Sequence, residues 1–164
     1  MIAQTQTSPS SPPFTGVRGR ALSRLLQLPF VRYHRVQLGF VERPRQYRRF
    51  LADVLGPRLD ALPGRIGVFG VGVHTEIVLK ALPAFADRIH CFTDNNATMW
   101  QQTRFGKTVL PPTTAVEECD AFLLSTAVFQ RVLEGDLRRL GFTGPVVAVD
   151  DHVPAAWFLG ADHG

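Results

Sequence analysis

From residue 63 onward, short apolar runs alternate with segments in which apolar residues recur every three or four positions. Short apolar runs are typical of buried strands, and the three-to-four spacing is typical of helices that pack one face against a core. The alternation of the two patterns predicts βαβ units around a largely parallel sheet. The expected strands are 65–70, 88–93, 107–110, 120–125 and 145–149.

Helices are expected between these strands, at about 73–82 and about 127–140. Residues 95–106 should hold at most a short helical turn, and Pro111 and Pro112 suit the start of a further helix. The apolar face of the first helix should comprise Val73, Ile77, Val78, Ala81 and Leu82. That of the second should comprise Val128, Phe129, Val132, Leu133, Leu137 and Leu140, with Gly141 as its stop.

Crossovers between parallel strands are nearly always right-handed, which restricts the order of the strands in the sheet. The predicted fold class is therefore α/β, a doubly wound, Rossmann-like sheet of five parallel strands in the order 3-2-1-4-5. An arginine-rich helical extension precedes it. At 164 residues and 45% hydrophobic composition, the chain should bury a single core.

The segment 44–55 carries apolar residues at helical spacing, and its arginines lie mostly on the other side. We expect an amphipathic helix that ends at Gly56-Pro57, packs on the following domain and keeps its arginines solvated. The predicted organisation is a disordered tail over 1–16, a basic helical extension over 17–62, a Rossmann-like domain over 63–152 and a tail over 153–164.

The net charge of +4 is unevenly distributed, because residues 1–65 hold eleven arginines and only three acidic residues. The acidic remainder argues against nucleic acid as a partner. No apolar run approaches the length of a transmembrane helix. A cytoplasmic location is expected, although the acid-free, arginine-rich segment 17–37 also resembles a mitochondrial presequence in composition.

The two cysteines, Cys91 and Cys119, lie in apolar contexts without CxxC spacing. They indicate buried thiols in a reducing compartment and neither a zinc site nor a disulfide framework. The five histidines show no metal-ligand spacing, so no metal is expected.

The stretch RIGVFGVGVHTE places a glycine turn between the first strand and the first helix. Gly70 allows a sharp bend, Gly72 allows close approach to the backbone, and the N–H groups of a helix start attract phosphate. The pattern Gly70-x-Gly72-x-x-Thr75 lacks the third glycine of the dinucleotide fingerprint. The alternative is a tight corner without a ligand.

Asp94 ends the second strand 24 residues after Gly70, where an acid often binds ribose hydroxyls. It could instead cap the following turn. His74, in the first helical turn, is expected to be a neutral hydrogen-bonding group, because the helix dipole disfavours imidazolium. The candidate ligand-binding residues are Gly70, Gly72, Val73, His74, Thr75, Asp94, Asn95, Ser125 and Thr126.

The segments FGVGVHTE, CFTDNN, TMWQQTRFGKTVLPP, DAFLLST and PVVAVDD together resemble a group of small Rossmann-like domains of bacterial polysaccharide and amino-sugar biosynthesis. The group includes the N-terminal sugar-nucleotide-binding part of sialic-acid-type acyltransferases and similar regions of nucleotide-sugar dehydratases. Gly70, His74, Asp94 and Asn95 match its motifs over residues 65–150. The resemblance implies a nucleotide or nucleotide-sugar ligand, whereas the hexapeptide repeats of the acyltransferases have no counterpart here.

Three functions fit these features. The first is a nucleotide- or nucleotide-sugar-binding module whose partner is a separate enzyme or, in a homo-oligomer, further copies of the chain. The second is an enzyme, either an NAD(P)-dependent oxidoreductase or a methyltransferase-like protein that uses S-adenosylmethionine, although no catalytic motif is recognisable. The third is a structural or regulatory domain that binds no ligand and docks through its arginine-rich helices.

Overall fold

A computed structural model describes residues 44–126 and 129–149. The predicted tails, residues 17–43 of the predicted basic extension 17–62, and Val128 lie outside these described residues.

A mostly parallel six-stranded sheet forms the centre of the domain, in the order β3-β4-β2-β1-β5-β6. The predicted α/β class is therefore confirmed. Each of the five expected strands is present. Four of them are one or two residues shorter than predicted, and β4 has the predicted bounds. Their bounds are β1 Ile66–Phe69, β2 Ile89–Thr93, β4 Lys107–Leu110, β5 Ala121–Leu124 and β6 Val146–Ala148.

The sixth strand, β3 (Thr103–Arg104), was not predicted, and it pairs antiparallel with β4 at the edge of the sheet. Phe105 and Gly106 connect the two strands, and both have a positive φ, 50° and 78°. A two-residue turn of this kind suits the twist of a hairpin. Phe105 adopts the uncommon conformation while its ring packs against Phe92, with ring centroids 5.4 Å apart.

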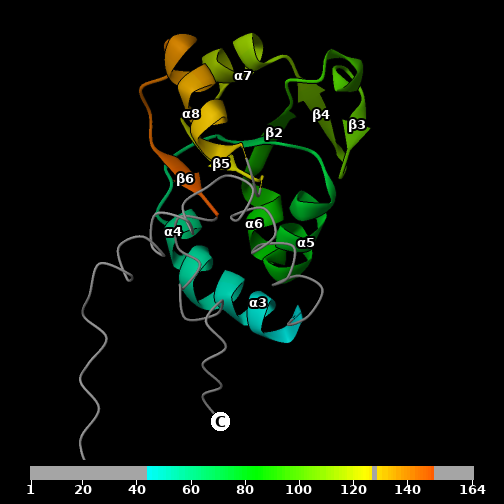
Figure 1. Ribbon diagram of the computed structural model, residues 1–164, viewed down its shortest axis with the longest axis vertical. Coiled ribbons are helices and arrows are strands. Elements are labelled where there is room, and N and C mark those ends of the chain that lie inside the picture. Colours follow the sequence, from blue (N-terminus) through cyan, green and yellow to red (C-terminus); the bar gives the residue numbers. More distant parts are fainter. Residues whose placement is uncertain (1–43, 127–128, 150–164) are drawn as a thin grey trace, which may run out of the picture.

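Helices cover both faces of the sheet (Figure 1). On one face lie α3 (Pro44–Phe50), the π-helix η1 (Leu51–Leu55), α4 (Gly56–Asp60), α5 (Val73–Ala81) and α6 (Pro83–Arg88). On the other lie α7 (Pro112–Glu118) and α8 (Gln130–Arg139). The 3-10 helix η2 (Ala97–Met99) follows β2. Two apolar clusters, one under each helical layer, form the core.

The N-terminal helix does pack on the domain as expected. Tyr47, Phe50, Leu51 and Leu55 are buried, whereas the arginines of α3 are exposed. Such amphipathic packing supplies most of the stability of a helix in a folded domain.

The prediction that Gly56-Pro57 ends this helix was wrong, since the chain continues through η1 into α4. The Gly56 N–H bonds to the Leu51 carbonyl five residues earlier, which is π-helical geometry. A proline inside an α-helix lacks its own N–H and clashes with the carbonyl four residues before it. The wider π turn immediately before Pro57 accommodates the proline ring without breaking the helix.

The predicted helix faces need correction at their ends. Val73, Phe129 and Val132 are exposed by 74%, 58% and 55%, and Leu140 by 39%. These residues occupy helix ends or the outer side of α8, where no helix or strand of the described residues covers them. Helix α6 was not predicted, and Pro83 occupies its first helical position.

No helix in the described part of the chain is long and apolar enough to span a membrane.

Candidate functional site

The glycine turn follows β1 at the edge of the sheet where the parallel strands end. Gly70 has φ +106°, and its N–H donates to the Thr93 carbonyl at 2.8 Å. A Cβ at this position would lie 2.8 Å from the Ser125 carbonyl oxygen. Glycine is therefore needed at position 70 for two reasons, the left-handed backbone and the close passage of β5.

Gly72 and Val73 lie at the open side of the turn. Gly72 is the N-cap of α5 and has extended backbone angles, and no side chain caps the helix there. A Cβ built on Gly72 meets no atom of the described residues within 4 Å, and the Val73 side chain is 74% exposed. The positive end of the α5 dipole is consequently accessible from outside the domain.

Next to this open turn, a buried hydrogen-bond network joins three elements. Tyr47 of α3 contacts His74 Nε2 at 2.8 Å, and His74 Nδ1 lies 3.1 Å from Ser125 Oγ after β5. The Ser125 and Thr75 hydroxyl oxygens are 2.9 Å apart, and Thr75 donates to the Gly70 carbonyl at 2.7 Å.

The donors and acceptors of the network are consistent with one another when the Thr75 hydroxyl donates its proton to the Gly70 carbonyl. Ser125 then donates to Thr75, His74 Nδ1–H donates to Ser125, and the Tyr47 hydroxyl donates to His74 Nε2. Each donor of this network then has one acceptor. The network thus binds the N-terminal helix to the backbone of the glycine turn.

Burial lowers the pKa of His74 from 6.5 to about 4, and a hydrogen bond with the Ser125 backbone opposes the shift only in part. His74 is 8% exposed. It is therefore neutral at physiological pH, as the sequence suggested, but desolvation is the larger cause where the helix dipole was expected. With both ring nitrogens engaged, His74 is poorly placed to take a proton from a substrate.

The Asp94 carboxylate links the second strand to the glycine turn. One oxygen accepts from the Val71 N–H at 3.3 Å and the other from the Asn96 N–H at 2.9 Å. Asn96, not Asp94, caps the 3-10 helix η2. Trp100 packs locally, and its indole N–H donates to the Asp94 carbonyl at 2.8 Å.

The two remaining candidates, Asn95 and Thr126, contact or adjoin α8. The Asn95 side-chain amide donates to Asp136 at 3.0 Å. The Thr126 carbonyl accepts from the Gln130 amide at 2.9 Å, and its hydroxyl accepts from the Phe129 N–H at 3.5 Å. Of the nine candidates, Gly72, Val73 and Asn95 are exposed, whereas the other six are buried or half-buried and hydrogen-bonded within the domain.

Two buried side-chain oxygens near this edge, Thr93 Oγ1 and Gln130 Oε1, have no hydrogen-bond partner among the described residues. Thr93 immediately precedes Asp94, and Gln130 begins α8. Unpaired buried oxygens are costly, so such atoms are candidates for bonds to solvent or ligand. The same described residues contain no group of three or more His, Cys, Asp or Glu side chains that could hold a metal ion.

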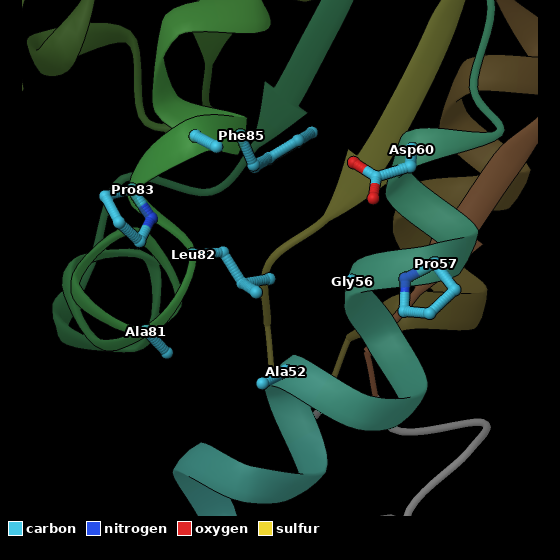
Figure 2. Close-up of a pocket in the computed structure, with 9 residues that line it drawn as sticks. Ala52, Gly56, Pro57, Asp60, Ala81, Leu82, Pro83 and Phe85 are labelled. Carbon is cyan, nitrogen blue, oxygen red and sulfur yellow. The ribbon is translucent and has the colours of Figure 1, made fainter.

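A groove of about 290 Å³ lies elsewhere, between the N-terminal helix and the junction of α5 with α6 (Figure 2). Leu82 lies beside Gly56, where a Cβ would be 3.5 Å from it. None of the nine candidate residues lines this groove. Its lining residues are Ala52, Gly56, Pro57, Asp60, Ala81, Leu82, Pro83, Ala84 and Phe85.

The sequence alone did not identify Tyr47 as a hydrogen-bond partner of His74. Tyr47 is 27 residues from His74 and was assigned only to an apolar stripe. The available signal was its hydroxyl, because a buried tyrosine usually needs a hydrogen-bond partner.

The chain matches no protein-family model, and a comparison with curated proteins finds no match either.

Proposed function

We propose that the domain is a binding module for a nucleotide or nucleotide sugar, held at the glycine turn, and that it serves an enzyme of sugar or polysaccharide biosynthesis. In this proposal the sheet is a doubly wound, Rossmann-like one, with β3 added at its edge. Ligands of such sheets bind outside the carboxyl ends of the strands, where the chain turns to opposite faces. The β1–α5 and β5–α8 connections border that position.

The observation that carries the proposal is the open space at Gly72. The exposed glycine, the uncapped start of α5 and the exposed side chain of Val73 leave the helix dipole accessible. A phosphate at this position would accept hydrogen bonds from backbone N–H groups. The backbone of Gly72 is extended and its surroundings are uncrowded, so the fold does not require glycine there, in contrast to Gly70 with its positive φ and the close passage of Ser125.

Asp94 supports the same proposal from the neighbouring strand. It is half-buried, and each carboxylate oxygen accepts one hydrogen bond from a backbone N–H. A carboxylate oxygen can accept two hydrogen bonds, so capacity for a ribose or sugar hydroxyl remains. The contact with Val71 fixes the carboxylate against the turn that would hold the phosphate.

The environment of His74 favours binding over catalysis. The ring is buried, neutral and engaged at both nitrogens, so it is suited to position the turn. An oxidoreductase or methyltransferase would still bind its cofactor at the same edge. NAD(P) and S-adenosylmethionine therefore belong among the ligands to be tested.

Isothermal titration calorimetry of the full chain with UDP-, GDP- and TDP-sugars, NAD(H), NADP(H) and S-adenosylmethionine tests the proposal. We expect saturable binding of one class and its loss in Gly72→Asp, whose carboxylate would repel a phosphate. Gly72→Ala should weaken binding and leave stability nearly unchanged, because its Cβ has room in the protein and narrows only the approach of a ligand.

The matched control is Gly135→Asp in α8, which makes the same charge change at another glycine with free space around its Cβ. It should bind like the wild type. Binding that survives Gly72→Asp would place the ligand away from the turn. Absence of binding for every compound would favour the alternative of a domain without a ligand. In that alternative the domain docks through the exposed arginines 45, 48 and 49 of α3.

A further inference from the structure

The structure brings the two cysteines of the chain together on the sheet face that carries α7 and α8. Cys91 lies in the middle of β2, and Cys119 directly follows α7, two residues before β5. Their sulfur atoms are 3.4 Å apart although the residues are separated by 28 positions. Both are free thiols and belong to the same apolar cluster.

A disulfide requires the two sulfur atoms to approach to about 2.05 Å, which is roughly 1.4 Å closer than they are here. Rotation of the two side chains about χ1 is the natural route for a movement of this size. Cys91 is held by strand pairing with β1, and the Cys119 N–H bonds to the Ala115 carbonyl at the end of α7. The two thiols are therefore kept adjacent in the folded chain.

The pair lies close to the surface. His90 and Glu118 directly precede the two cysteines. Their side chains are 35% and 42% exposed, and His90 Nε2 lies 2.9 Å from a Glu118 carboxylate oxygen across the same junction. Cys119 itself retains 6% exposure. Cys91 is 3% exposed, so an oxidant has to reach the pair at this junction, beside the half-exposed His90 and Glu118.

The two thiols are not equivalent. The hydrogen bond from the Cys119 thiol lowers the pKa of Cys91, whereas the same bond and burial raise the pKa of Cys119. Cys91 is accordingly the better nucleophile, because the thiolate is the reactive form.

We propose that Cys91 and Cys119 are a reversible redox modification site that closes to an intramolecular disulfide with hydrogen peroxide. The Cys91 thiolate attacks one peroxide oxygen, the O–O bond breaks, and Cys91 becomes a sulfenic acid as the other oxygen leaves as water after protonation. Cys119 sulfur then attacks Cys91 sulfur and displaces a second water. Two thiols are oxidised and one peroxide is reduced to two waters.

The test is peptide mapping of the full chain after one equivalent of hydrogen peroxide, unfolding and alkylation. Trypsin should release Cys91 within 89–104 and Cys119 within 108–131. We expect these two peptides to be linked, at a mass lower by two hydrogen atoms than their sum. Dithiothreitol should separate them and restore both thiols to alkylation.

Single variants test the order of the steps. Cys119→Ala should leave Cys91 as a sulfenic acid, which a dimedone-type reagent labels. In Cys91→Ala the same reagent should label far less sulfenic acid. The wild-type map does not depend on these variants folding. Two thiols that still alkylate after peroxide treatment, separate oxidation of each to a sulfinic acid, or linkage only between chains would overturn the proposal.

Discussion

His74 makes the stability of the domain dependent on pH in a defined direction. Its pKa is about 4 in the folded chain and 6.5 in the unfolded chain. Because the unfolded state binds the proton more readily, stability is greatest above pH 6.5 and falls as the pH is lowered toward 4. The loss from this one residue is about 2 kcal/mol at pH 5 and approaches about 3 kcal/mol below pH 4.

Urea denaturation at pH 7 and pH 5 measures this loss in wild type and in His74→Gln. Other groups titrate in the same range, so the informative quantity is the difference between the two proteins. Gly135→Ala is the control, because it changes no titratable group and its Cβ has free space. It should lose as much stability between pH 7 and pH 5 as the wild type does.

The expected result is that His74→Gln is less stable than wild type at pH 7 and loses about 2 kcal/mol less on acidification. An equal loss in wild type and His74→Gln would refute the argument. It would mean that the ring is solvated or already protonated in the folded chain.

The other predictions concern packing and hydrogen bonding, and urea denaturation at pH 7 measures each. Tyr47→Phe leaves His74 Nε2 buried without its partner and should cost about 1–3 kcal/mol; a neutral effect would argue against the buried network. Gly67→Ala places a Cβ on the ring of Phe122 and should cost about 1–3 kcal/mol. Gly135→Ala has free space inside a helix and should stabilise by about 0.5–1 kcal/mol, so equal effects at the two glycines would contradict the packing described.

The alternation of apolar patterns determined which elements form. Burial dominates the energetics of strands such as β1 and β5, so their apolar runs located them to within a residue or two. The stripe of α3 likewise identified which side of the helix packs on the sheet. The glycine turn was recognisable for the same kind of local reason, since Gly70 needs a positive φ.

Local signals failed where a backbone conformation depended on its surroundings. Pro57 reads as a helix stop, yet the preceding π turn accommodates it. The hairpin at Phe105 was missed because phenylalanine rarely adopts a positive φ, and it does so here with its ring packed against Phe92. Val73 has helical spacing, but no helix or strand of the described residues covers it.

Only the tertiary structure decided which polar groups meet. Tyr47, His74 and Ser125 are far apart in the sequence, and the crossing of α3 over the end of the sheet brings them within hydrogen-bond distance. The adjacency of Cys91 and Cys119 has the same origin, because Cys119 ends α7, and α7 packs on β2, which carries Cys91. Hydrophobic periodicity specifies the face of each element, whereas contacts between elements depend on strand order and helix placement, which a local pattern does not encode.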